Sequence, residues 1–170
     1  MQALIKTAQS DAGITLKVLN AVEAANDAQK RVLGAKVIKR FGSNLKGKHF
    51  AMWGLAFKAN TDDMRKASSR EVIADLLAAG ATVTAYDPVA MKEARHLYAN
   101  EPRLTFADNQ TAVLEGADAL IILTEWREGR SPNFDTIKAA LVSPVIFDGR
   151  DLCDPKLERV LRFEYLAIGR

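Results

Sequence analysis

The stretch W-G-L-A-F-K-A-N-T-D-D-M-R-K-A-S-S-R-E, which runs from Trp53 to Glu71, decides the fold of this sequence. An apolar strand pattern precedes it, and a pattern with helical periodicity follows it. In α/β proteins a strand, a turn of small residues and the start of a helix form the place that holds phosphates. The loop here is longer than a simple nucleotide-binding turn needs. We therefore predict that this loop is the main functional feature of the chain.

From Lys48 onward, strand and helix patterns alternate. The predicted strands are His49 to Trp53, Thr82 to Tyr86, Leu104 to Phe106, Ala119 to Leu123, Val145 to Phe147 and Tyr165 to Ile168. The predicted helices are Ser69 to Ala79, Ala90 to Tyr98, Thr111 to Leu114, Phe134 to Leu141 and Pro155 to Leu161. This alternation predicts an α/β, Rossmann-like, doubly wound fold with a mostly parallel six-stranded sheet. In such folds ligands bind at the carboxyl ends of the strands.

A long helix is predicted before this sheet. Ala3 to Ala12 form a short helical pattern that Gly13 ends, and Thr15 to Phe41 form a long one that Gly42 ends. The long helix spans about 40 Å, which exceeds the body of a small domain. Its apolar face either packs only on its own sheet or also packs against a second copy. Small residues that permit close helix approach favour the second alternative: Ala21, Ala24, Ala25 and Ala28.

Polar residues interrupt the apolar pattern in the middle of the long helix. The set consists of Asn26, Asp27, Gln29 and Lys30. It is either a solvated face or a polar patch at a subunit contact. We expect residues 1–44 to form a connecting and dimerisation helix region, and residues 45–170 to form the Rossmann-like domain.

The composition limits the classes of function. A length of 170 residues fits one domain plus an appended element. Cys153 is the single cysteine, which rules out an intramolecular disulfide and is typical of a reducing compartment such as the cytoplasm. Because His49 and His96 are far apart, we predict no metal site. The net charge of +3 is scattered, so we expect no nucleic-acid surface, and no apolar run indicates a membrane span or signal peptide.

The turn after the first strand is a degenerate dinucleotide fingerprint. It reads Gly54-x-Ala56-x-x-Ala59, and alanine in the second position adds a methyl group where a pyrophosphate would approach the backbone. The acidic residue that binds ribose is expected about 20 residues further on. Asp87 lies well beyond that distance and precedes Pro88, so we interpret it as a turn residue. The fold is the right one, but the turn does not indicate an ordinary dinucleotide site.

The loop carries two cations that are candidates for anion binding. Lys58 provides a point charge for phosphate, and Arg65 can bind in bidentate fashion. The alternative is that both are solvated charges paired with Asp62 and Asp63. Their position above the first strand favours anion binding. Further on, S-x-x-E, from Ser68 to Glu71, predicts a capping box at the next helix.

Three further residues follow later strands or lie near them. Arg150, in D-G-R, is a candidate for phosphate binding, and an ion pair with Asp151 is the alternative. Trp126 either stacks on a base or covers the sheet edge, and we favour covering. We interpret Cys153 as a packed or surface thiol and not as a nucleophile, because no histidine is near it in sequence.

Several motifs together resemble those of UDP-glucose 6-dehydrogenases. G-L-A-F-K-A-N-T-D-D-M-R-K-A-S-S, from Gly54 to Ser69, is similar to the family signature G-x-A-F-K-x-x-T-D-D-x-R-x-S/A-x-S. Five other segments resemble the family in order along nearly the whole chain: A-N-D-A-Q-K (25–30), A-Y-D-P (85–88), L-T-E-W (123–126), F-D-G-R (147–150) and Y-L-A-I-G-R (165–170). GDP-mannose and UDP-N-acetylhexosamine dehydrogenases are similar relatives. The A-F-K and T-E-W segments look closer to the UDP-glucose branch.

The resemblance implies an NAD-dependent enzyme that oxidises the C6 position of UDP-glucose twice, through a thiohemiacetal and a thioester on a cysteine. It implies an N-terminal NAD domain, a central helix that forms the dimer core, and a C-terminal domain that holds the UDP-sugar. By this resemblance Phe57, Lys58 and Arg150 contact the substrate, and Arg65 reaches the NAD phosphates or the active-site cleft.

The sequence also departs from the family pattern. The family's G-G-x-C-F-P-K-D segment, with the catalytic cysteine, would precede Ala3, so we assign no catalytic residue here, and Cys153 does not inherit that role. Lys66 stands where an acidic residue is common. We expect a homodimer that binds UDP-glucose, with NAD bound mainly by the N-terminal domain. The alternatives are a non-catalytic nucleotide-binding or assembly module, or the same part of a GDP-mannose or UDP-N-acetylhexosamine dehydrogenase.

Overall fold

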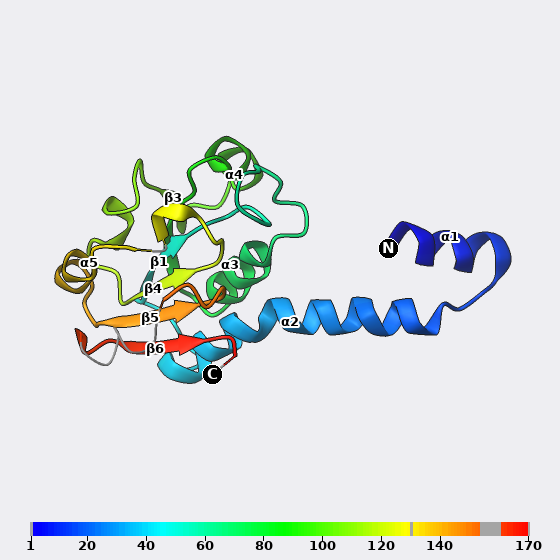
Figure 1. Ribbon diagram of the computed structural model, residues 1–170, viewed down its shortest axis with the longest axis horizontal. Coiled ribbons are helices and arrows are strands. Elements are labelled where there is room, and N and C mark those ends of the chain that lie inside the picture. The colour runs from blue at the N-terminus through cyan, green and yellow to red at the C-terminus, as the bar shows by residue number, and fades with distance from the viewer. Residues whose placement is uncertain (1, 130, 154–160, 170) are drawn as a thin grey trace.

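The computed structural model describes residues 2–129, 131–153 and 161–169, and it confirms the predicted fold class. Its six-stranded sheet has the order β3-β2-β1-β4-β5-β6, and every neighbouring pair is parallel (Figure 1). The strands are β1 His49–Trp53, β2 Thr82–Tyr86, β3 Leu104–Phe106, β4 Ala119–Ile122, β5 Val145–Asp148 and β6 Glu164–Ala167. The first three have the predicted bounds, β4 and β5 differ by one residue at their C-terminal ends, and β6 is shifted by one residue toward the N-terminus at both ends.

The helices also lie close to their predicted positions. They are α1 Gln2–Ala12, α2 Lys17–Phe41, α3 Ser68–Ala78, α4 Met91–Leu97 and α5 Phe134–Ala140, with 3₁₀ turns η1 Ala112–Leu114 and η2 Arg127–Gly129. The predicted helix from Thr111 to Leu114 is therefore a 3₁₀ turn over 112–114, and η2 was not predicted. The helix predicted from Pro155 to Leu161 lies almost wholly outside the described residues. None of the helices in the described ranges combines the length and the apolar character that crossing a membrane requires.

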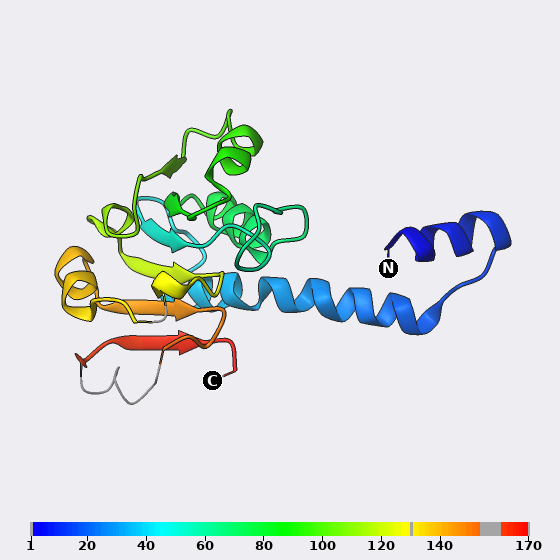
Figure 2. The same ribbon diagram turned by 45° about the horizontal axis from the view of Figure 1, so that its top comes forward.

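Strand residues alternate between two cores on opposite faces of the sheet. Phe50 and Met52 point into the core beneath α2 and α3, whereas Ala51 and Trp53 point into the core beneath η1 and α5. Because both faces are covered, β4 is buried at every position. Figure 2 shows the parallel strands with helices on either side, as expected for a doubly wound sheet.

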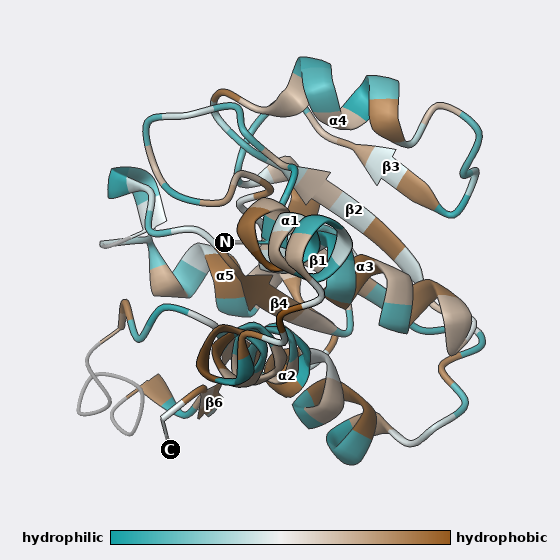
Figure 3. Ribbon diagram, turned by 90° about the vertical axis from the view of Figure 1, so that its right-hand side faces the viewer, coloured by the Kyte–Doolittle hydropathy of each residue, from teal (hydrophilic) through white to brown (hydrophobic). Residues whose placement is uncertain are grey.

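The long helix α2 has two different halves. Leu33, Gly34 and Val37, in its C-terminal half, are buried against the sheet. The N-terminal half projects beyond the sheet domain, and α1 folds back beside it (Figure 1). Val18 in this projecting half is 77% exposed. Figure 3, which looks along the helix, shows both brown and teal residues on it.

A close approach fixes α2 on α3. A Cβ atom on Gly34 would lie 3.0 Å from the Asp75 carboxylate, so glycine lets the two helices meet here. Arg31, one turn away, pairs with Asp75 at 3.1 Å and with Glu71 at 2.6 Å. These contacts hold the helix against the domain at the edge where the strands end.

The strand order changes direction between β1 and β4, and there the backbone packs tightly. Gly54, directly after β1, has a φ of +88°, which disfavours a side chain. A Cβ atom at this position would lie 2.5 Å from Thr124 Cβ. Because ligands of doubly wound sheets bind at this switch point, the fold places the quoted loop over the expected site.

Candidate functional site

A buried carboxylate anchors the loop that follows β1. Asp87 is fully buried at the end of β2, and its Oδ2 atom accepts hydrogen bonds from Leu55 N at 2.7 Å and Ala56 N at 3.1 Å. Trp126 Nε1 donates to the same oxygen at 3.0 Å. The other oxygen, Oδ1, accepts from Val89 N and Ala90 N and so forms the predicted turn. Asp87 therefore shapes a turn, as predicted, and also joins three loops. Trp126 is partly buried and packs against the core.

The fit of a dinucleotide to this turn is poor for a physical reason. The amides of Leu55 and Ala56 occupy the place where a Rossmann turn binds pyrophosphate, but both donate to Asp87. A second anion there would face the Asp87 carboxylate. The structure thus agrees with the interpretation that this turn is no ordinary dinucleotide site.

Two hydroxyl groups hold the loop from its other sides. Ser69 Oγ donates to Leu55 O at 2.6 Å, and Thr124 Oγ1 donates to Ala56 O at 2.7 Å. The predicted capping box at Ser68 and Glu71 is wrong. The N-cap of α3 is Ala67, which offers no side-chain oxygen, and Glu71 turns to Arg31 instead.

A second buried carboxylate, Asp148, shapes the segment after β5. Its Oδ1 accepts from Arg150 N at 2.7 Å, and its Oδ2 accepts from Tyr165 Oη at 2.7 Å. Leu152 N and Cys153 N donate to Oδ2 as well. This carboxylate fixes the backbone of the D-G-R turn, and therefore also the direction in which the Arg150 side chain leaves it.

The guanidinium of Arg150 lies over the switch point. Its Nε donates to Leu123 O and its Nη2 to Phe57 O, each at 2.9 Å. Glu125 Oε2 lies 3.1 Å from Nε and supplies a counter-charge that the sequence analysis did not consider. Within the described residues Arg150 Nη1 has no hydrogen-bond partner, so that end of the fork is available to an anion.

A cleft of about 590 Å³ lies between α2 and this edge of the sheet. Phe57 and Arg150 line it from the loops, and the Phe57 side chain is 48% exposed. Residues of α2, of the loop before α3, of the start of α3 and of the segments after β5 and β6 complete the lining: Glu23, Asn26, Gln29, Lys30, Lys66, Ser68, Gly149, Asp151 and Ile168. A volume of this size is typical of small-molecule sites.

The other two predicted site residues lie outside the lining of this cleft. Lys58 is exposed and makes no ion pair within the described part of the chain. Arg65 is 87% exposed at its side chain and grips Asp63 in a bidentate pair, at 3.0 Å and 2.8 Å. This pair lowers the pKa of Asp63 to about 2, first through the hydrogen bonds from the Arg65 side chain and backbone. The alternative pairing considered for Arg65 is therefore the one that the structure shows.

A larger groove of about 880 Å³ runs between α2 and α3 and is lined by Arg65. Most of its charges are already compensated. Lys30 pairs with Asp27, Arg31 with Glu71, and Arg103 with Glu101. We take the smaller cleft as the candidate site, because it lies at the switch point and contains an arginine with an unoccupied end.

Sequence reasoning did not assign the α2 residues of the cleft to a binding site. Asn26 and Gln29 were singled out as a polar interruption, but their neighbours in space were unknown. Ser68 was assigned to helix capping. A polar stripe on an otherwise apolar helix was the available signal, and only the position of α2 relative to the sheet shows what it faces.

Comparisons with known proteins show which family the chain belongs to. Residues 51–155 match the UDP binding domain of the UDP-glucose/GDP-mannose dehydrogenase family. The chain is 40% identical over 173 residues to a UDP-glucose 6-dehydrogenase of Pseudomonas aeruginosa, covering 100% of this chain and 38% of that protein. It is 39% identical to the UDP-glucose 6-dehydrogenase of Rhizobium meliloti, covering 99% of this chain and 38% of that protein.

A solved structure shows the same similarity. The UDP-glucose dehydrogenase of the hyperthermophilic archaeon Pyrobaculum islandicum matches with a TM-score of 0.77 at 28% identity, covering 98% of this chain and 35% of that one. The chain thus spans little more than a third of the length of these relatives and corresponds to their C-terminal part. Since the family match covers more than half of the chain, this protein belongs to the UDP-glucose/GDP-mannose dehydrogenase family, in which it represents the UDP binding domain and the helices that precede it.

Proposed function

We propose that this chain is the C-terminal portion of an NAD-dependent UDP-glucose 6-dehydrogenase, which converts UDP-glucose and two NAD molecules to UDP-glucuronate. In this proposal residues 45–170 hold the nucleotide sugar, residues 1–44 connect and dimerise, and the enzyme works in the cytoplasm. The observation that carries the proposal is the cleft at the switch point of a UDP-binding fold, with Phe57 and Arg150 in its lining.

The three substrate-binding residues have different tasks. Arg150 offers its Nη1 end to the diphosphate, because its other nitrogens are held by Leu123 O and Phe57 O. The exposed ring of Phe57 provides an apolar surface for a planar or pyranose ring. Lys58, next to it, adds a positive charge at the rim that the ligand meets from solvent.

The cofactor is not held by the turn after β1, because Asp87 occupies its amides. We propose that NAD is bound mainly by the portion of the relatives that this chain does not match. When bound, NAD would accept the hydride. From this chain, Arg65 would reach toward the NAD phosphates, and its exposed guanidinium would leave Asp63 to do so.

By the family resemblance catalysis needs a cysteine thiol, and the lining of the cleft within the described residues contains no cysteine. Cys153 is only 4% exposed, and it is absent from the cleft lining found in the described residues. We infer that the chain alone binds nucleotide sugar without oxidising it. Turnover of UDP-glucose with NAD by the 170-residue chain alone would contradict this inference.

Exposed apolar residues on α1 and on the projecting N-terminal half of α2 support the proposed homodimer. Val18 is 77% exposed and Leu4 is 57% exposed, and a contact with a second copy would remove these side chains from water. Sedimentation equilibrium should show a dimer, which Val18→Asp weakens. A wild-type chain that stays monomeric at high concentration would contradict the proposal.

Ligand-dependent thermal unfolding tests the proposed substrate class. UDP should raise the unfolding temperature more than GDP does, and NAD should raise it least, because only ligands of the folded state stabilise it. A larger shift with GDP would favour a GDP-mannose dehydrogenase. No shift with any of the three would favour the assembly module.

A further inference from the structure

The helix α2 presents a polar stripe to the candidate cleft. Glu23, Asn26 and Lys30 follow one another at spacings of three and four residues, so they lie on one face of the helix. Gln29 flanks this stripe. All four line the same cleft as Phe57 and Arg150. The polar interruption of α2 therefore has a position in the fold that a merely solvated face would not require.

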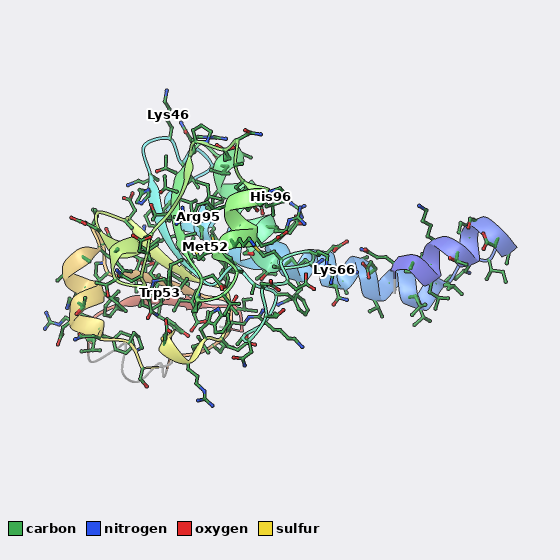
Figure 4. The ribbon with its side chains drawn as sticks, turned by 90° about the horizontal axis from the view of Figure 1, so that it is seen from above. Lys46, Met52, Trp53, Lys66, Arg95 and His96 are labelled. Carbon is green, nitrogen blue, oxygen red and sulfur yellow. The ribbon has the colours of Figure 1, made fainter. Side chains whose placement is uncertain are left out.

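The stripe forms one wall of the cleft, and the charged side chains of this wall are already paired with opposite charges. Lys30 pairs with Asp27 at 2.9 Å, and Glu23 lies 3.9 Å from Lys66. Figure 4 shows Lys66 beside α2, where this contact bridges the helix and the loop before α3. A wall whose charges are paired has little to offer a phosphate, which would bind better at Arg150.

Unlike these charged side chains, the two side-chain amides of the wall have no partner within the described residues. Within the described part of the chain, Asn26 and Gln29 form no side-chain hydrogen bond, and both are exposed to the cleft. Each amide carries two N–H donors and a carbonyl acceptor. A hydroxyl group, which both donates and accepts, matches such an amide. A phosphate lacks a donor and would leave the carbonyl facing negative charge.

The spacing of the amides distinguishes a sugar from a base. Residues three apart on a helix lie about 5–6 Å from each other, on successive turns. Two amides at that separation meet atoms on different sides of a ring, as the hydroxyls of a pyranose are placed. The hydrogen-bonding edge of a uracil is a single short line, which one amide would cover.

We propose that Asn26 and Gln29 bind the sugar hydroxyls of the nucleotide sugar, so that the connecting helix selects the sugar while Arg150 binds the diphosphate. This inference rests on the proposed function. The position of the wall is fixed, because Arg31 ties α2 to Glu71 and Asp75 of α3.

Calorimetric titration of the 170-residue chain with UDP and with UDP-glucose tests the inference. Asn26→Ala and Gln29→Ala should each lower the affinity for UDP-glucose about fivefold to tenfold, as loss of a hydrogen bond does, and leave the affinity for UDP within twofold. Asn20→Ala is the matched control, because Asn20 is an exposed asparagine of the same helix outside the cleft. It should change neither affinity.

The outcomes separate this inference from the proposed function. Equal losses for UDP and UDP-glucose would assign the wall to the uridine and overturn the sugar assignment. Unchanged affinities in both variants would remove α2 from the site. A wild-type chain that binds neither ligand would contradict the proposed function itself. Circular dichroism of each variant checks that the helix is retained.

Discussion

Two sets of charges lie at the same edge of the sheet and behave in opposite ways. Asp87 and Asp148, after β2 and β5, are fully buried. Lys58 and Arg65, in the loop after β1, are exposed. Asp87 accepts five hydrogen bonds from the described residues, and Asp148 accepts four. Lys58 has no partner among these residues, and Arg65 has a partner two positions away.

This difference distinguishes the charges that fix the loops at the sheet edge from the charges that can bind a ligand. A buried carboxylate is stable only when N–H and O–H groups surround it, so it becomes a fixed point to which loops attach. An exposed cation loses little when it changes partners, so it can meet a ligand. The acids therefore set the geometry from which Arg150 and Phe57 reach the cleft.

Asp87→Ala should have the largest effect on stability. It would leave five buried or partly buried donors without their acceptor, and we expect a loss of about 3–5 kcal/mol in the free energy of unfolding. Urea unfolding followed by circular dichroism measures it. Asp62→Ala, which removes an exposed acid of the loop, should cost less than about 0.5 kcal/mol. Equal losses of stability in the two variants would contradict the claim that the buried acid anchors the loops whereas an exposed charge of the loop does not.

Tyr165→Phe sharpens the comparison at the second acid. It removes the hydroxyl that donates to Asp148 Oδ2 at 2.7 Å and leaves the other three donors in place. We expect a loss of about 1–2 kcal/mol, since the acceptor is charged. Tyr86→Phe is the control, because the structure gives the Tyr86 hydroxyl no hydrogen bond within the described ranges. A larger loss in the control would show that ring packing matters more than the hydrogen bond.

Lys58→Ala should leave stability within about 0.5 kcal/mol, because the side chain is exposed. We expect the affinity for UDP to fall about tenfold, as removal of one charge contact to a phosphate does. Titration calorimetry gives the affinity. Lys46→Ala, an exposed lysine in the segment before β1, serves as the control and should bind UDP normally. Unchanged affinity in Lys58→Ala would remove Lys58 from the site.

The smallest effect is expected at Asp63, whose pKa is lowered to about 2 by Arg65. Because the folded-state pKa lies below the ordinary value, this pair stabilises the fold above pH 4 and loses its contribution as the pH falls through 2. Solvent screening keeps that contribution small. NMR titration of the carboxyl carbon should give the low midpoint, and Arg65→Ala should return it toward the ordinary range. An unchanged midpoint would show that the pair is not formed in solution.

The predictable part of the fold rests on local chemistry. The alternation of short apolar strand patterns with helical patterns along the chain predicted β1, β2 and β3 to the residue. Gly42 ends α2, as predicted, with a φ of +97°. The capping box failed because α3 begins at Ser68 with Ala67 as its N-cap, and because Glu71 pairs with Arg31, which is distant in sequence. A local capping motif forms only when its side chains have no better tertiary partner, and here Glu71 has one in Arg31.

The sequence by itself determined the α/β class, the loop above β1 and the candidate cations, because strand and helix periodicity and a strand–turn–helix junction are properties of neighbouring residues. Only the tertiary structure decided that Asp87 and Asp148 hold that loop and the Arg150 turn, that Glu125 faces Arg150, and that Asn26 and Gln29 face the cleft. These pairs join residues from different strands and helices, and their distances are fixed by how the sheet twists and where α2 packs on it. Asp87, which the sequence indicated only as a turn residue, and Asp148, to which it assigned no role, are both buried and hold these loops.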